Sequence, residues 1–211
     1  MSLWARLFAA LYDRAMAASE QEGLADRRRE LLAAAHGRVI EIGAGTGANL
    51  AHYPRAVREL VLVEPEQAMR ARLRRRLGEL PEGVSASVIE GRAERIALDD
   101  ASFDCAVSTL ALCTVADQAR ALGELSRLLR PGGRLLLIEH VRSEEERVRR
   151  WQDRLAGLWR LCGRGCHPNR DTLAAIRAAG FDVSEVRRGE VPRAPAIVRP
   201  MISGVAIASP G

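Results

Sequence analysis

The sequence contains no lysine, because every one of its 32 basic side chains is an arginine. This absence excludes enzymes that hold a substrate or pyridoxal phosphate through a lysine Schiff base, and it excludes nucleotide-binding P-loops, whose lysine reaches the phosphates. Long apolar runs are also missing, since no stretch approaches the roughly 18 uninterrupted apolar residues of a membrane-spanning helix. The segment 1–11 contains Arg6 and no small-residue cleavage site, so we expect no signal peptide and predict a cytoplasmic protein with reduced cysteines.

Aromatic side chains make up only 4% of the chain, and their scarcity decides whether the net charge of +5 indicates nucleic-acid binding. A basic protein is a candidate for binding nucleic acid. Its arginines, however, cluster on predicted helix surfaces without interleaved aromatics that could stack on bases, at residues 27–29, 72–76 and 147–150. We interpret these clusters as solvated faces and predict no nucleic-acid partner.

Metal ligands are few as well. Cys162, Cys166 and His167 lie close together, but a structural zinc site needs four ligands, usually from two such clusters, and the other candidates are far away in sequence. We therefore predict no metal site.

The chain has 211 residues, 47% of them hydrophobic, which is enough for one domain with a buried core. Short β-branched apolar runs predict strands at 38–42, 60–64, 84–89, 103–109, 134–140, 181–187 and 201–208. Amphipathic stretches predict helices at 67–77, 117–129, 143–162 and 169–179, and the first 35 residues are predicted to form two helices separated by Gly23. Strands and helices that alternate in this way indicate βαβ units and an α/β fold with a parallel sheet.

A glycine-rich loop at 43–47 follows the first predicted strand and is expected to open a helix. Its glycines let the backbone turn sharply and approach a ligand closely. With Ala48 the loop also satisfies the dinucleotide-binding fingerprint. Two acids argue against a dinucleotide, because Glu41 would place a carboxylate near a pyrophosphate, and Glu64 ends the next strand, where it could accept both hydroxyls of a ribose. S-adenosylmethionine, which carries a ribose and a cationic amine, fits this pattern better.

Four segments together resemble the motifs of class I S-adenosylmethionine-dependent methyltransferases, at residues 41–47, 62–64, 98–104 and 128–133. The resemblance covers about residues 37–140. It implies an α/β, Rossmann-like doubly wound sheet of seven strands in the order 3-2-1-4-5-7-6, with strand 7 antiparallel. We expect a single methyltransferase domain over 1–211, divided into a helical N-terminal lid (1–36), a cofactor-binding core (37–140), and substrate-side helices and final strands (141–211).

The resemblance also implies roles for single residues. Gly43, Gly45 and Gly47 would pass under the methionine and ribose part of the cofactor, Glu41 would face its amine, and Glu64 would hold its ribose. Many relatives carry Gly-Asp-Ala-Glu after the third strand, where this chain has an arginine in place of the aspartate, so the segment 91–94 must reach the adenine differently. The full set expected to contact the cofactor is Tyr12, Glu41, Gly43, Ala44, Gly45, Gly47, Asn49, Glu64, Pro65, Arg92, Ala93, Glu94, Thr109 and Leu110.

The second half of the chain narrows the choice of methyl acceptor. It lacks the Asn/Asp-Pro-Pro-aromatic stretch of nucleic-acid amine methyltransferases, and none of the nine prolines precedes a cysteine, as in cytosine-carbon methyltransferases. An ordered series of segments is instead similar to the membrane-associated alkyl-thiol methyltransferases of animals, at residues 11–13, 49–54, 109–115, 138–141, 165–170 and 198–204. Those proteins carry a longer apolar anchor than residues 3–11, which favours at most weak contact with a membrane surface.

We therefore predict methyl transfer to a small, fairly apolar acceptor, with a thiol sulfur as the first choice. A thiol with a pKa near ~8.5 needs little activation, and a histidine near ~6.5 could take its proton. His140, at the end of the fifth predicted strand, is the candidate base, with a purely structural histidine as the alternative. Cys113, Trp159 and Cys166 are expected to line the substrate pocket. An apolar stripe on the predicted helix at 143–162 would form a lid or pack in the core, and it consists of Trp151, Leu155, Leu158 and Trp159.

Three alternatives stay open at this stage. The first is a carbon, oxygen or lipid-amine methyltransferase of the same fold. The second is a protein that binds the cofactor without catalysis, against which the intact Glu41 and Glu64 argue, and the third is an NAD oxidoreductase, which only Ala48 favours. The sequence predicts a small-molecule substrate and leaves the oligomeric state open.

Overall fold

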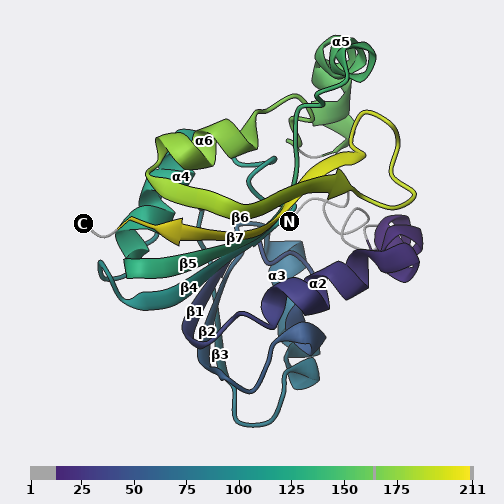
Figure 1. The fold of residues 1–211 in the computed structure, drawn as a ribbon. Helices are drawn as coiled ribbons and strands as arrows, with labels where there is room; N and C mark the ends of the chain where they lie inside the picture. Colours follow the sequence, from purple (N-terminus) through teal and green to yellow (C-terminus); the bar gives the residue numbers. More distant parts are fainter. Residues whose placement is uncertain (1–12, 164, 210–211) are drawn as a thin grey trace.

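A computed structural model describes residues 13–163 and 165–209, which form one seven-stranded sheet with helices on both faces (Figure 1). The strands lie in the order β3-β2-β1-β4-β5-β7-β6, and β7 is antiparallel to both of its neighbours. They span Gly37–Ile42 (β1), Val57–Val63 (β2), Ser85–Ile89 (β3), Phe103–Thr109 (β4), Leu129–His140 (β5), Phe181–Glu190 (β6) and Pro200–Ala208 (β7). The predicted fold class, strand order and antiparallel strand are confirmed.

The helical elements connect the strands. Residues 13–19 are helical and run into a π-helical turn, where Gly23 adopts a φ of 122° and separates them from the following helix, as predicted. The elements span Glu20–Leu24 (η1), Ala25–Leu32 (α2), Leu50–His52 (η2), Gln67–Arg76 (α3), Leu77–Glu79 (η3), Gln118–Leu128 (α4), Glu146–Cys162 (α5) and Thr172–Ala178 (α6). None of the helices in the described ranges is long and apolar enough to cross a bilayer.

The core is divided into two layers by the sheet. Alternate residues of a strand point to opposite faces, so Ile40 and Ile42 of β1 join the layer under α4 and α6, whereas Val39 joins the layer under α2 and α3. Both faces of the central strands are therefore apolar, which is typical of parallel strands covered by helices on each side. In Figure 1, α4 and α6 cover one face and α2 and α3 the other.

Several predicted boundaries move for identifiable reasons. The side chains of Asp117 and Asp171 accept hydrogen bonds from Arg120 N (3.0 Å) and Ala174 N (3.1 Å), and so fix the starts of α4 and α6 one and three residues after the predicted ones. Strand β5 begins at Leu129, because that residue already pairs with Phe103 of β4.

The prediction of a helix directly after the glycine loop is wrong. The loop leads only into the 3₁₀ turn η2, and Tyr53 adopts an extended conformation (φ −66°, ψ 135°). Tyr53 precedes Pro54, and a residue before proline is excluded from the helical region by the proline ring. The chain therefore turns at once into β2.

Candidate active site

A cavity of about 610 Å³ opens at the carboxyl ends of β1, β2 and β4. This is the edge of an open α/β sheet at which ligands bind, because β1 lies where the strand order reverses. Eight predicted residues line the cavity, namely Gly43, Gly45, Glu64, Pro65, Arg92, Ala93, Glu94 and Leu110. Nine further lining residues had not been singled out, namely Glu66, Met69, Glu90, Gly91, Ala111, Thr114, Val115, Ala116 and Gly163.

The glycine loop forms one wall of the cavity. Gly43 and Gly45 have φ values of 60° and 57°, in the left-handed region that favours glycine. A Cβ atom on Gly43 would lie 2.6 Å from the Cβ of Ala111, on the opposite wall. Gly47 serves packing instead, because a Cβ there would lie 2.7 Å from Cδ1 of Leu50. Ala44 donates its N–H to Val63 O (3.2 Å) and holds the loop onto β2.

Glu64, directly after β2, organises the floor of the cavity. Its Oε2 accepts a hydrogen bond from Gly45 N (2.9 Å), and its Oε1 accepts one from Glu66 N (2.8 Å). Each carboxylate oxygen can accept about two hydrogen bonds, so both oxygens keep capacity for a ligand hydroxyl. Burial raises the pKa of Glu64, and the two backbone hydrogen bonds oppose that shift.

Glu41 lies beneath the glycine loop and does not line the cavity. Its side chain accepts hydrogen bonds from Asn49 Nδ2 (2.8 Å) and Tyr53 OH (2.7 Å), and the residue is only 2% exposed. Burial raises its pKa to about 7, although both hydrogen bonds and the charge of Arg28 lower it. Arg28 of α2 donates from Nη1 to Asn49 Oδ1 and Thr109 Oγ1 (2.9 Å each), so these side chains form one buried polar network.

The network has two consequences for the predicted site. Glu41, Asn49 and Thr109, three members of the predicted cofactor set, are brought together, but none of them lines the cavity. The network also ties the N-terminal helices to the site, since Arg28 pairs with Glu20 (3.0 Å). Tyr12, the remaining member of the predicted set, lies outside the described residues.

The walls of the cavity are acidic. Glu64, Glu66, Glu90 and Glu94 line it together with a single arginine, Arg92. Glu90 is paired with Arg70, and Glu94 Oε1 accepts hydrogen bonds from Ala116 N (2.8 Å) and Asp117 N (3.2 Å). An excess of carboxylates favours a cationic ligand and opposes a pyrophosphate.

The opposite wall is the segment after β4, and it is fixed by Glu139. This fully buried carboxylate accepts hydrogen bonds from Ser108 Oγ (2.6 Å) and from the N–H groups of Ala111 (3.0 Å), Leu112 (2.9 Å) and Cys113 (3.2 Å). Leu110, where the wall begins, has a φ of 57°, a conformation that a non-glycine residue rarely adopts. Sequence reasoning missed Glu139, although an acid directly after the apolar run 135–138 was the available signal.

The residues predicted for the acceptor side do not line the cavity themselves. The thiol of Cys113 contacts that of Cys166, and this contact together with burial raises the pKa of Cys113. A Cβ atom on Gly163, which lines the cavity, would lie 3.1 Å from Trp159 Nε1 and 3.3 Å from Cys166 Cβ. The three predicted side chains therefore pack together directly behind this wall.

His140 ends β5, where it pairs with Met201 of β7, and it too lies outside the cavity lining. Burial lowers its pKa to about 4, although a hydrogen bond with the Val198 backbone raises it. Its Nδ1 is buried and has no hydrogen-bond partner among the described residues. The ring is therefore neutral near pH 7 and able to accept a proton, but only as a weak base.

The apolar stripe predicted on α5 is divided by the structure. Leu155 and Trp159 are half-buried, whereas Trp151 is 48% and Leu158 63% exposed. Of the two alternatives, packing of all four side chains in the core does not hold, because Gln152, and not an apolar residue, is the buried centre of this helix. The lid stays a prediction. No three His, Cys, Asp or Glu side chains within the described ranges are close enough together to hold a metal ion.

Comparison with known proteins gives a consistent result. Residues 40–137 match the family described as a methyltransferase domain. The chain is 30% identical over 202 residues to the human thiol S-methyltransferase TMT1A, covering 95% of this chain and 82% of that protein. It is 31% identical to the human thiol S-methyltransferase TMT1B, covering 86% and 78%. A solved S-adenosylmethionine-dependent methyltransferase from Thermotoga maritima, described as a possible histamine N-methyltransferase, has the same fold, with a TM-score of 0.67 at 24% identity over 96% of this chain and 95% of that one.

Proposed function

Because the chain belongs to the class I S-adenosylmethionine-dependent methyltransferases of the alkyl-thiol type, we propose that it methylates the sulfur of a small, fairly apolar thiol. Its cofactor is S-adenosylmethionine. The observation that carries the thiol acceptor is the extent of the similarity to a thiol S-methyltransferase, which reaches over 95% of this chain and so includes the acceptor side as well as the cofactor-binding part.

The cavity at the ends of β1, β2 and β4 fits this cofactor. At Gly43 the glycine loop packs directly against Ala111, because a Cβ atom there would lie 2.6 Å from the Ala111 Cβ, and both residues line the cavity. Glu64 keeps lone pairs for the ribose hydroxyls, and the four glutamates of the lining suit the positive charges of the sulfonium and the amine. We assign the adenine to the wall formed by Arg92, Ala93 and Glu94, and we expect Glu41 to act on the amine from behind the cavity lining.

The same assignment divides the chain into three parts. Residues 37–140 form the cofactor-binding core of a single methyltransferase domain, and residues 141–211 form the acceptor side. Residues 13–36, the described part of the predicted N-terminal segment, act as a lid. The lid is supported by Arg28, which joins α2 to Asn49 and Thr109 directly under the cofactor site.

The chemistry of the site favours sulfur over oxygen. The bound cofactor supplies a methyl group on a sulfonium, already activated for in-line attack by a nucleophile. The protein's task is to hold that nucleophile in line and to exclude water. Near neutral pH a few per cent of a thiol is already ionised, whereas an alcohol needs a strong base or a metal. The chain has no lysine, its described residues gather no metal ligands, and Cys113, Trp159 and Cys166 give the acceptor end an apolar surrounding.

His140 is the candidate base for the thiol proton, and its low pKa allows this role to be tested through the pH dependence of turnover. Its neutral ring can accept a proton, but a pKa of about 4 makes this transfer uphill from a thiol near ~8.5. If His140 acts as the base, its replacement by alanine lowers turnover at pH 7 by more than at pH 9, where the substrate ionises unaided. Equal losses at both pH values would leave His140 a structural role only.

The proposed function is tested with pairs of acceptors that differ only in sulfur and oxygen. We expect methylation of small aliphatic and aromatic thiols, and turnover at least about 100-fold lower for the alcohols and phenols of the same shape. S-adenosylhomocysteine binding, measured by its effect on the melting temperature, controls for a correctly folded site. A protein that binds S-adenosylhomocysteine but methylates none of the thiols would contradict the thiol acceptor.

A further inference from the structure

Helix α5 presents a second stripe, different from the predicted apolar one, that is exposed and lies outside the methyltransferase site. Arg147, Trp151, Arg154, Leu158 and Leu161 follow one another at intervals of four and three residues, so they lie on one side of the helix. All five are exposed, with Leu158 at 63% and Leu161 at 78%. Isolated exposed leucines are ordinary, but a tryptophan and two leucines in one stripe form an apolar surface that faces solvent.

The opposite side of α5 is held firmly to the rest of the protein. Gln152 is fully buried, and its Nε2 donates hydrogen bonds to the carbonyl oxygens of Val141 (3.1 Å), Pro168 (2.9 Å) and Ile197 (3.0 Å). Its Oε1 accepts a hydrogen bond from Ser143 N (2.9 Å). The stripe is therefore presented in a fixed orientation. Figure 1 shows α5 projecting from the body of the protein.

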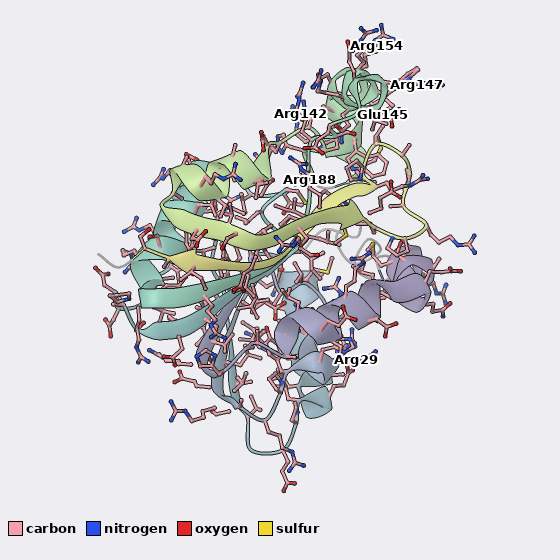
Figure 2. All side chains as sticks on the ribbon, viewed as in Figure 1. Arg29, Arg142, Glu145, Arg147, Arg154 and Arg188 are labelled. Carbon is pink, nitrogen blue, oxygen red and sulfur yellow. The ribbon has the colours of Figure 1, made fainter. Side chains whose placement is uncertain are left out.

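The charges around α5 are distributed unevenly. Near its base, Arg142 is paired with Asp153 (2.7 Å) and Arg188 with Glu144 (3.0 Å), so the acids on that side are neutralised. Arg147 and Arg154 point away from the sheet (Figure 2), and neither forms an ion pair with another described residue. The guanidinium of Arg154 instead lies 5.7 Å from the ring of Trp151. α5 carries five arginines against two acids, and two of these arginines, Arg147 and Arg154, lie on the stripe.

We propose that the stripe on α5 is a docking surface for an anionic lipid bilayer. An interfacial helix combines arginines, which attract lipid phosphates, with tryptophan and leucine side chains that enter the boundary of the acyl chains. Arginine suits this role, because its guanidinium forms bidentate hydrogen bonds with phosphate. With 17 residues α5 is about 25 Å long, enough to lie along the surface, and it cannot cross the bilayer.

Charge complementarity selects this partner over a second copy of the chain. Two α5 stripes placed face to face would bring arginines of both copies together, whereas an anionic bilayer supplies the opposite charge. A nucleic acid would be bound through phosphates, but it would leave Leu158 and Leu161 in water.

Docking through α5 also places the cavity beside the bilayer. The helix ends at Cys162, and the next residue, Gly163, lines the cavity. Apolar acceptors concentrate in a membrane, so the docked protein would receive them close to its site. This last point rests on the proposed function, whereas docking itself is measured without any turnover.

The test measures binding of the full chain to vesicles by co-sedimentation at physiological salt. The vesicles contain phosphatidylcholine alone or with about one-third phosphatidylserine. We expect at least about 10-fold stronger binding to the anionic vesicles, decreasing as salt is added. The double variant Arg147→Glu/Arg154→Glu should lose at least about 10-fold of that affinity, and Leu158→Ser/Leu161→Ser should weaken binding roughly 10-fold or more.

The matched control is Arg120→Glu/Arg177→Glu, which makes the same change of charge at exposed positions on α4 and α6. It should change vesicle affinity by less than about threefold. The altered leucines are exposed, so their variants should keep the wild-type melting temperature. Equal binding to neutral vesicles, equal losses in the α5 and control variants, or self-association through Leu158 and Leu161 without vesicle binding would each overturn the proposal.

Discussion

Three buried glutamates close to the site have different tasks because their neighbours differ. Glu64 lines the cavity. Each of its carboxylate oxygens accepts one backbone hydrogen bond and can accept another from a ligand. Glu41 is enclosed by Asn49 and Tyr53 and holds the 3₁₀ turn η2 that follows the glycine loop. Glu139 gathers three N–H groups and a hydroxyl and so fixes the wall after β4. Only the first of these has free hydrogen-bonding capacity facing a ligand.

Glu64 should therefore dominate affinity for the cofactor. We expect Glu64→Ala to weaken binding of S-adenosylhomocysteine roughly 10- to 150-fold, since hydrogen bonds to a charged group contribute about 1.5–3 kcal/mol. Calorimetric titration measures the change. Glu59→Ala is the control, because Glu59 lies on β2, the strand directly before Glu64, but is paired with Arg38 at the surface; this variant should bind normally. A loss below twofold in Glu64→Ala would show that this carboxylate does not hold the ribose.

Glu41 should make stability depend on pH. Its pKa is raised to about 7 in the folded protein, so the folded state binds this proton more tightly than the unfolded state does. The resulting stabilisation is fully present below the ordinary pKa near 4.5 and is lost as pH rises through 7. Between pH 4 and pH 8 the wild type should lose on the order of 3 kcal/mol more unfolding free energy than Glu41→Gln.

Urea unfolding at a series of pH values measures this difference. Glu64 and Glu139 also have raised pKa values, but they are present in both proteins and their contributions cancel in the comparison. Parallel stability curves for wild type and variant would contradict the titration assigned to Glu41.

At the scale of elements, the glycine loop and the segment after β4 both line the cavity and are in close contact at Gly43 and Ala111. A Cβ atom on Gly43 meets the Cβ of Ala111 at 2.6 Å, and its φ of 60° disfavours any side chain. We expect Gly43→Ala to lower cofactor affinity at least about 10-fold and to lower the unfolding free energy by about 1–3 kcal/mol. Calorimetric titration and urea unfolding measure the two effects.

Gly123 provides the control for this prediction. It lies inside α4, and a Cβ atom there would meet nothing within 4 Å. Gly123→Ala should leave cofactor binding unchanged and stabilise the protein by about 0.5–1 kcal/mol, because alanine favours a helix. If Gly43→Ala bound the cofactor as well as Gly123→Ala does, the loop would not approach the ligand as closely as proposed.

Elements with a local signal could be predicted from the sequence. The bounds of β4, Phe103–Thr109, agree with its apolar run, and the glycine loop with Glu64 led to the correct edge of the sheet. The hydrogen-bond partners of Glu139 and Arg28 could not be predicted in this way, because they lie up to 31 and 81 residues away. The orientation of α5 could not be predicted from local pattern either, since Gln152 is its buried centre and the predicted apolar stripe is divided between half-buried and exposed side chains.

For the molecule as a whole, the sheet brings these distant residues to one edge. The strand order places the ends of β1, β2 and β4 side by side, and α5 leads from the exposed surface directly to the cavity wall at Gly163. The buried polar network around Arg28 connects the N-terminal helices to the same edge. The architecture thus brings the proposed cofactor site and the proposed acceptor side to one edge of the sheet.

The most direct measurement follows the methyl group itself. Purified protein is incubated with S-adenosylmethionine carrying a deuterated methyl group and with an aliphatic or aromatic thiol, and the products are identified by mass spectrometry and NMR. The account predicts that the label appears on the acceptor sulfur, with an equal amount of S-adenosylhomocysteine, and that Gly43→Ala greatly reduces both. No labelled thioether from protein that binds the cofactor, or a label on carbon, oxygen or nitrogen of an acceptor that also offers a thiol, would contradict it.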